Sequence, residues 1–369
     1  MHNVKKALVV GALAPLALTL FLLAFLWPMA TMEPRDISTA VVGEPQQVAQ
    51  IQKALDEKKP GLLKTQPASD RAEAERLIQQ REVSGAIVLG QEPEVLYSSA
   101  AGLPQANIIK NLSQPLSEMA SRQAKAAAQA KGLPENKVPS VDVKARDLAP
   151  LDSRDPQGAG INFSILPVAF GGMIGAALIS FTLQKNTQRL LAFTVYAPLG
   201  GLLVSWVYSG VFDLLPAGFW TSAGVFTLGI AASSSFIVGL RALFGTPGFG
   251  LGALAIMLIG NPLAGTMAPK EFIASPWGAL GQLFPNAATA SLTRSANYFP
   301  LASISTEVWT LLAWIAVGLC ALAAGIVKER KQSQQENPAA EESTQPQPAY
   351  GPPLEAYFLE NCPGHNGKQ

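Results

Sequence analysis

Charged residues, cysteine and histidine are all scarce in this 369-residue chain. Only 14% of its residues are charged and 49% are hydrophobic, whereas about a quarter of a soluble domain is charged. The surface of an ordinary globular protein cannot be assembled from this composition. The two cysteines, Cys320 and Cys362, are too few for a disulfide framework or a cysteine metal site.

The polar groups that enzymes need are also missing. Residues 30–160 contain no histidine or cysteine, and their carboxylates are interspersed with cations as on a solvated surface. No G-x-x-x-x-G-K-[ST] phosphate loop occurs in the chain, and 27 cations against 26 anions leave no basic excess for nucleic acid. We expect no catalytic residue, cofactor, metal or nucleic-acid partner, and an ATP-driven step would require a separate subunit.

Long apolar runs dominate the rest of the chain. Residues 31–157 contain 33 of the 53 charged side chains, whereas residues 156–327 contain only eight. Six uncharged runs are long enough to cross a bilayer core of about 30 Å at about 1.5 Å per residue. These runs are residues 7–29, 162–183, 190–212, 217–240, 248–267 and 308–327.

The first run, residues 7–29, has two interpretations. Lys5 and Lys6 precede it, as in a cleavable signal peptide, but it is longer than a signal sequence of about 15 apolar residues and no A-x-A site follows. These features favour a membrane anchor. Residues 272–283 are also apolar, but the run is short and interrupted by Pro276, which favours a re-entrant hairpin near residues 269–285.

Cations mark the segments expected inside the cell. With residues 1–6 as a cytoplasmic N-terminus, every inner segment is basic, as the positive-inside rule requires. The cations concerned are Lys5, Lys6, Lys185, Arg189, Arg241, Lys328, Arg330 and Lys331. The pattern predicts a multi-pass plasma-membrane protein with both termini cytoplasmic. Residues 328–369, rich in Gln, Glu and Pro, are expected to form a disordered cytoplasmic tail.

Residues 30–160 have the pattern of an extracytoplasmic α/β domain. Strands are expected at residues 37–42, 85–89 and 94–98, and helices at 46–58 and 70–80. A longer helix over residues 108–131 is expected to kink at Pro115. The predicted fold class is a polytopic α-helical membrane protein with six transmembrane helices. The α/β domain is inserted between helices 1 and 2, and residues 161–327 form the other five helices.

The predicted spans carry small residues where charges are absent. Gly171 and Gly175 stand four residues apart, a spacing that lets helices pack closely within one subunit or between two. No span has a charged side chain at its centre, which weighs against ion-coupled transport. If the protein moves a compound, the energy is expected to come from another subunit.

Residues 259–299 carry the most specific pattern. Asn261-Pro262 interrupts the fifth span, and Gly265, Pro269 and Pro285 follow. Together with one span, a large external domain and five further spans, this stretch resembles ABC-2 type permeases with a long ectodomain, related to the Pip phage-infection-protein family. The external segment with Ala74, Leu77, Gly85, Ala86, Ile87 and Val88 resembles the same family. The short N-terminus and the short loop around Arg241 depart from it.

The resemblance implies a function and partners. It implies a permease subunit of an ATP-driven exporter for a hydrophobic or amphiphilic compound, lying in the lipid bilayer with a cytoplasmic P-loop ATPase and with a second copy or a related permease chain. ATPase coupling is expected at Lys185, Arg189, Arg241 and Phe244. An outer gate is expected at Asn261, Pro262, Gly265, Pro269, Phe272 and Pro285. The alternative is a non-transporting membrane scaffold or surface receptor.

Overall fold

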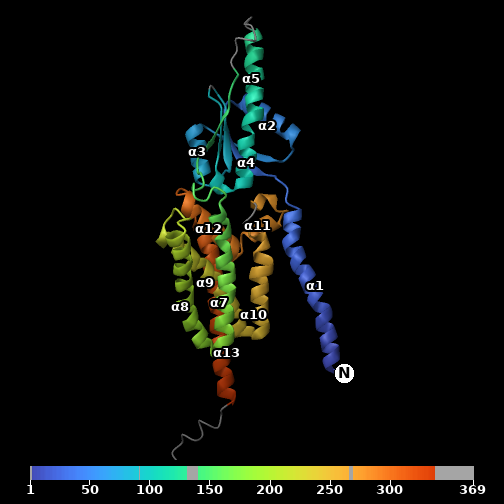
Figure 1. Ribbon diagram of the computed structural model, residues 1–369, viewed down its shortest axis with the longest axis vertical. Helices are drawn as coiled ribbons and strands as arrows, with labels where there is room; N and C mark the ends of the chain where they lie inside the picture. Colours follow the sequence, from blue (N-terminus) through green and yellow to red (C-terminus); the bar gives the residue numbers. More distant parts are fainter. Residues whose placement is uncertain (1, 91, 131–139, 266–268, 337–369) are drawn as a thin grey trace, which may run out of the picture. The chain divides into compact units, whose positions relative to one another are not determined.

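The computed structural model describes residues 2–90, 92–130, 140–265 and 269–336. This part of the chain is mostly helical and includes five helices long and apolar enough to cross a membrane (Figure 1). By length and composition they indicate a multi-pass membrane protein. The corresponding elements are α1 (His2–Ala30), α7 (Ile165–Thr182, continuing α6, Ala159–Phe163), α8 (Asn186–Ser205, extended by the π-helical η3, Trp206–Val211), α9 (Phe219–Phe244) and α13 (Ser305–Glu336).

The fifth predicted span, residues 248–267, is a shorter helix in the structure. It consists of α10 (Thr246–Ala253) and the π-helical η4 (Leu254–Gly260), followed by the 3-10 turn η5 (Pro262–Ala264). The 8 and 7 residues of α10 and η4 extend about 22 Å at 1.5 Å per residue, less than the roughly 30 Å of a bilayer core. A sixth membrane crossing therefore stays a prediction.

Helix α9 is the centre of the helical bundle. Of its apolar window 72% is buried, against 0% for α1. Glycines bring α9 and α13 into backbone contact: a Cβ atom on Gly239 would lie 2.2 Å from the carbonyl oxygen of Gly318, and one on Gly318 would lie 2.4 Å from the Ser235 carbonyl carbon. Small residues thus let the two helix backbones approach closely. Apolar helices in a membrane associate through this van der Waals packing, because lipid offers no hydrophobic driving force between them.

The two glycines expected to pack helices both face Tyr196 on α8. A Cβ atom on Gly175 would lie 2.0 Å from the Tyr196 ring, whereas at Gly171 the nearest atom is the Tyr196 hydroxyl oxygen at 3.7 Å. That hydroxyl donates a hydrogen bond to the Gly171 carbonyl. Gly175 is therefore the position where a side chain cannot fit, and the contact lies within one chain.

Residues 37–147 form a five-stranded sheet with the order β2-β1-β3-β4-β5. Strands β1, β2 and β3 are mutually parallel, β4 is antiparallel to β3, and β5 is parallel to β4. We call residues 37–147 the α/β region. Its strands are β1 (Ile37–Val42), β2 (Leu63–Ala68), β3 (Gly85–Val88), β4 (Glu94–Tyr97) and β5 (Lys144–Asp147), and its helices are α2 (Pro45–Lys58), α3 (Arg71–Gln79), α4 (Leu103–Asn111) and α5 (Ser113–Ala130), with the 3-10 turn η1 (Ser99–Ala101).

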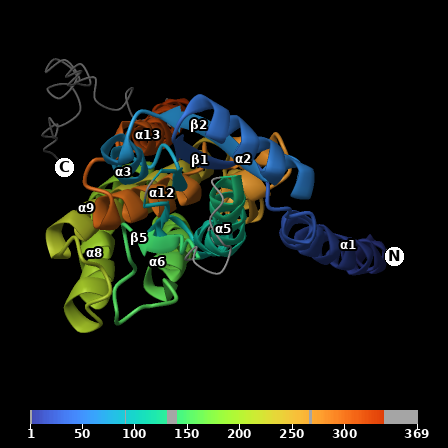
Figure 2. The same ribbon diagram turned by 90° about the horizontal axis from the view of Figure 1, so that it is seen from above.

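Alternate residues of the strands build the two apolar faces of the sheet. Ala40, Ala86 and Leu96 pack with α3 on one face. Ile87 and Val95 pack on the other face with apolar residues of α2, α4 and α5. The two-residue period of a strand explains this division, and Figure 2 shows α3 and α2 on opposite sides of β1 and β2.

The predicted inner strands and helices of the α/β region are confirmed, including the cap of α3, where Asp70 accepts a hydrogen bond of 2.8 Å from the Glu73 amide. Strands β2 and β5 were not predicted. The predicted long helix is two helices that separate at Leu112. In one continuous helix Pro115 would have no amide hydrogen to donate to the carbonyl four residues earlier, and its ring would clash with that carbonyl. This region and the bundle belong to one compact unit, Met1–Ile326, so a separate domain of residues 30–160 stays a prediction.

The start of the predicted disordered tail is wrong. Residues 328–336 continue α13, because Lys, Glu, Arg and Gln are good helix formers. The remainder of the predicted tail lies outside the described residues.

Candidate functional site

Short helices follow the interrupted fifth apolar helix. The predicted hairpin near residues 269–285 consists of the 3-10 turn η6 (Lys270–Phe272) and the five-residue α11 (Trp277–Gly281). Helix α12 (Pro285–Tyr298) comes next and was not predicted. The sequence of α12 has no apolar stripe, because its buried residues include polar ones such as Asn286, Thr289 and Ser295 beside the alanines. Helix α12 packs against α9 through contacts such as Gly229 with Thr289.

The hairpin is attached to the α/β region. The Phe272 side chain is only 4% exposed and packs in the same apolar cluster as Ile37 and Ile87 of the sheet. The Phe272 carbonyl accepts a hydrogen bond of 3.2 Å from the Glu33 amide. Because its side chain is buried in this core, Phe272 is an anchor of the hairpin here, rather than a side chain facing an open passage.

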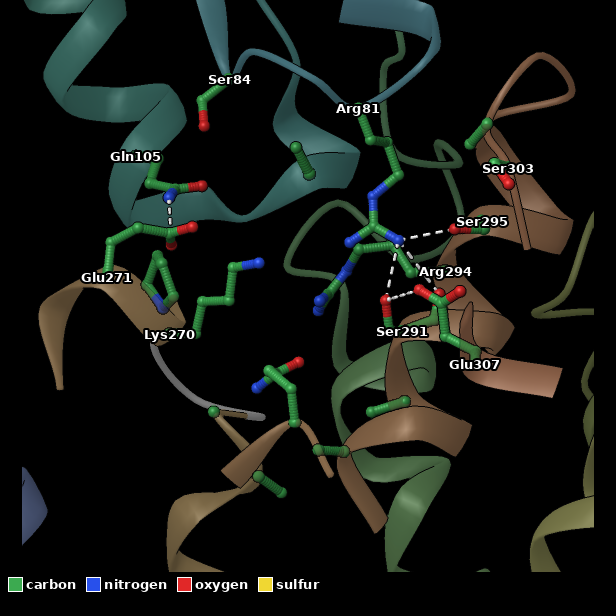
Figure 3. Close-up of a pocket in the computed structure, with 18 of the residues that line it drawn as sticks. Arg81, Ser84, Gln105, Lys270, Glu271, Ser291, Arg294, Ser295, Ser303 and Glu307 are labelled. Atoms are coloured by element: carbon green, nitrogen blue, oxygen red, sulfur yellow. Dashed lines mark hydrogen bonds between the residues drawn. The ribbon is translucent and has the colours of Figure 1, made fainter. Parts of the chain in front are cut away.

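A polar cavity of about 240 Å³ lies between the α/β region, the hairpin and α12 (Figure 3). We call it the chamber. Figure 3 shows the nitrogen atoms of Arg81, Lys270 and Arg294 directed towards the same space. The chamber is lined by Gln80, Arg81, Val83, Ser84, Ala101, Gln105, Ala264, Gly265, Pro269, Lys270, Glu271, Gln282, Ala287, Ala290, Ser291, Arg294, Ser295, Ala302, Ser303 and Glu307.

Arg81 reaches the chamber because of how α3 ends. Its amide bonds to the Ile78 carbonyl and the next amide, of Glu82, bonds to the Leu77 carbonyl, as in a Schellman cap. The residue after the cap is usually glycine, yet Arg81 adopts this left-handed conformation with φ +60°. Such a conformation costs a residue with a side chain about 1–3 kcal/mol, and residues held in it cluster at functional sites.

The Arg81 guanidinium is bound on one side by α12. Its Nη1 donates to the Ser291 carbonyl and hydroxyl, both at 3.1 Å, and to the Ser295 hydroxyl at 2.6 Å. Ser291 in turn donates to Glu307 Oε1 at 2.8 Å, while Glu307 Oε2 is buried without a hydrogen-bond partner among the described residues. Burial lowers the pKa of Arg81, and the charges of Glu307 and Glu271 oppose that shift.

Arg294 is the second guanidinium of the chamber. Its Nη2 donates to the Asn162 side chain at 3.1 Å. Burial, followed by repulsion from the charge on Arg81, lowers the pKa of Arg294 to about 10. The two arginines are therefore close enough to repel each other, which is unfavourable in a partly buried cavity.

Five of the six residues expected at an outer gate lie in two groups. Gly265 and Pro269 line the chamber, and Pro285 begins α12, which forms one of its walls. Asn261 and Pro262 lie just before them, where the π-helix changes to a 3-10 turn. Phe272 is separate from both groups, because it is buried among α/β-region residues.

The residues expected to couple to an ATPase lie where α7 turns into α8 and α9 into α10. Lys185 and Phe244 are exposed, Phe244 by 57%. The Arg241 guanidinium lies 5.7 Å from the Phe181 ring centre, which brings the two turns together. Arg189 is buried and donates to the Asn186 side chain and the Leu183 carbonyl at 2.6 and 3.1 Å, so it stabilises the first turn.

The sequence contained a signal for the chamber, namely charged residues in an apolar part of the chain, but these residues are far apart along the chain. Of the eight charged residues in the apolar part of the chain, four line this one cavity: Lys270, Glu271, Arg294 and Glu307. Their convergence with Arg81 depends on the packing of α12 against the end of α3. No local pattern in the sequence indicates that contact.

Known proteins add nothing to this description. A scan against protein-family models, a search of curated proteins and a search of solved structures each return no match. Functional reasoning therefore depends on the geometry of the chain.

Proposed function

We propose that this protein is the membrane-spanning permease subunit of an ABC-2 type exporter, driven by a separate cytoplasmic P-loop ATPase. One observation carries the proposal: the apolar bundle has a cluster of exposed turns at one end and a polar chamber at the other. The cargo in this proposal is hydrophobic or amphiphilic, and the location is the plasma membrane with both termini cytoplasmic.

The length of α7 separates the two ends. Asn162, bound to Arg294 of the chamber, precedes the first residue of α7, and Phe181, beside Arg241, lies at its end. The 18 residues of α7 extend about 27 Å at 1.5 Å per residue. A movement of the turns would reach the chamber through α7 and the central α9, which pack along their length.

The composition of the bundle supports an external energy source. Helix α7 contains no charged residue, and Arg241 in the last turn is the only one in α9. Ionisable groups in the bilayer interior are what ion-coupled carriers use, so ATP hydrolysis by a partner is the better match. Exposed apolar residues along α1 and α8, such as Leu13 and Leu191, give a second permease chain and lipid a surface to cover.

Native purification tests the proposal. The protein would be extracted from its own membrane in mild detergent, and its stoichiometric partners identified by mass spectrometry. We expect a P-loop ATPase whose ATP hydrolysis is lost when its phosphate-loop lysine is replaced. Replacing Lys185 and Arg241 together by glutamate should weaken the association, while Lys110→Glu in α4 should leave it unchanged. A homo-oligomer lacking an ATPase would contradict the proposal.

A second cavity favours the alternative of a surface receptor. It measures about 360 Å³ and is lined mainly by apolar residues, among them Ile51, Leu89 and Met119. Its wall includes the residues that follow β3. Strands β1 and β3 are neighbours in the sheet, and the chain leads from β1 to β2 on one side and from β3 to β4 on the other. Ligands of open α/β sheets bind at such points. Binding of an apolar ligand by a protein that lacks an ATPase partner would favour the receptor.

A further inference from the structure

The chamber has more positive than negative groups. Arg81, Lys270 and Arg294 face Glu271 and Glu307, which leaves a net charge of +1 from three cations and two carboxylates. Each of these charged groups comes from a different element or from the hairpin, so the fold, and no local run of sequence, gathers them. None of the five belongs to an ion pair within 4.0 Å among the residues that the structure describes.

The two carboxylates are already engaged by neutral groups. Glu271 accepts a hydrogen bond of 3.2 Å from Gln105, and Glu307 accepts one of 2.8 Å from Ser291. Arg81 is linked to Glu307 through that serine, whereas the bond to Asn162 gives Arg294 no negative charge. Of the two guanidinium groups, that of Arg294 is therefore the less compensated.

Burial and the neighbouring Arg81 both lower the pKa of Arg294, which remains protonated at neutral pH. Two guanidinium groups that repel each other in a partly buried cavity are stabilised by an anion between them.

We propose that the chamber binds a phosphate group, with Arg81 and Arg294 as its two forked donors and Lys270 at the rim. Guanidinium groups bind phosphate oxygens through paired N–H donors, and an ammonium group adds a point charge. The cavity of about 240 Å³ is several times the roughly 30 Å³ that a water molecule occupies in the liquid. It accommodates the phosphate together with part of the molecule that bears it.

The net charge selects among phosphates. A phosphodiester carries one negative charge and neutralises the chamber, whereas inorganic phosphate at neutral pH carries up to two and exceeds it. The expected preference is a phosphodiester such as a phospholipid headgroup. This site does not depend on the permease proposal, because a receptor or scaffold could bind the same group.

Thermal unfolding of the full chain tests the proposal. The protein in neutral detergent would be followed by the fluorescence of its six tryptophans while one of three probes is added at constant ionic strength. The probes are a short-chain phosphatidylglycerol, the matching phosphatidylcholine and inorganic phosphate. We expect phosphatidylglycerol to raise Tm in a saturable manner, because a ligand that binds only the folded state stabilises it.

Variants connect the response to the chamber. Arg294→Gln and Arg81→Gln should abolish the saturable rise, whereas Arg76→Gln, on the exposed surface of the same α3, should retain it. Arg294→Gln removes both a repelling charge and the hydrogen bond to Asn162, so the response of each variant is measured relative to its own Tm without ligand. If Arg294→Gln fails to fold, Lys270→Gln at the exposed rim provides the test, with a several-fold loss of affinity expected.

The probes distinguish the source of the phosphate. A response to phosphatidylglycerol alone identifies a lipid headgroup, and a response to inorganic phosphate as well identifies a site for soluble phosphates; both outcomes support the chamber. If the wild type responds to neither phosphatidylglycerol nor inorganic phosphate, the proposal is overturned. An equal response from wild type and Arg294→Gln also overturns it. An ATPase partner found or lost in native purification changes neither result.

Discussion

Replacing Phe272 by alanine tests whether the hairpin is anchored in the α/β region. The side chain is 4% exposed and lies in an apolar cluster with sheet residues. Removing a buried phenylalanine side chain costs about 3–5 kcal/mol, from lost burial and from the cavity that remains. The substitution keeps the backbone carbonyl of residue 272, which accepts the Glu33 amide in the wild type, so the expected loss belongs to the side chain.

Hydrogen exchange of backbone amides measures this loss where it occurs. If the hairpin opens locally, its amides exchange in proportion to the population of the open state. A destabilisation of about 3 kcal/mol raises that population by about two orders of magnitude, at tenfold for each 1.4 kcal/mol. We expect peptides covering residues 269–285 to exchange faster by about this factor in Phe272→Ala.

Leu283→Ala is the matched control, because this leucine belongs to the same hairpin but is 59% exposed. It should leave exchange in the hairpin close to that of the wild type. Equal exchange in Phe272→Ala and Leu283→Ala would refute the anchoring of the hairpin by the α/β core.

Three further predictions concern packing, pH and the inner turns. Gly318→Ala should lower Tm by an amount that corresponds to about 1–3 kcal/mol of overpacking, because its Cβ would lie 2.4 Å from the α9 backbone. Gly224→Ala, with no neighbouring atom within 4 Å, should leave Tm unchanged. Equal Tm values for the two variants would contradict the close contact of α9 and α13. A hydrogen bond from a neighbouring arginine lowers the pKa of Asp152 from 3.8 to about 2, so its stabilisation is present above pH 3.8 and is lost as the pH falls through about 2. Unfolding curves of Asp152→Asn should show a smaller loss of stability in that interval, and an unchanged loss contradicts this. Arg189→Met should destabilise the protein by about 1–3 kcal/mol, because it removes buried hydrogen bonds. Lys185→Met, at an exposed position, should change stability by less than about 0.5 kcal/mol. Equal unfolding free energies for the two variants would show that the hydrogen bonds of Arg189 do not stabilise the turn.

The sheet illustrates how far sequence patterns extend. Strand β3 (GAIV) has no polar side chain, and strand β1 (ISTAVV) has four apolar residues beside Ser38 and Thr39. The residues of each strand alone predict a buried strand. The missed strands are the two edges of the sheet. Strand β2 contains Pro67, which an edge strand tolerates, and β5 has the sequence KARD, whose charges suit an edge. Edge strands are recognised by their neighbours, which no local pattern reveals.

The chamber illustrates the opposite difficulty. Its charged residues were visible in an otherwise apolar part of the sequence, but they are separated along the chain and appeared to belong to unrelated loops. Arg81 joins them through a left-handed backbone conformation at a position where glycine is usual. Helix α12 was missed because its buried serines, threonines and asparagines do not produce an apolar stripe.

Cross-linking from Phe244 tests the central claim most directly. Its side chain is 57% exposed in the last turn of α9, so a photoreactive amino acid at this position samples whatever covers the turns in the native membrane. The permease account predicts a cross-link to a P-loop ATPase, and none to that protein from the same group at Ser303 beside the chamber. Cross-links from Phe244 only to lipid or to another copy of the chain would contradict it.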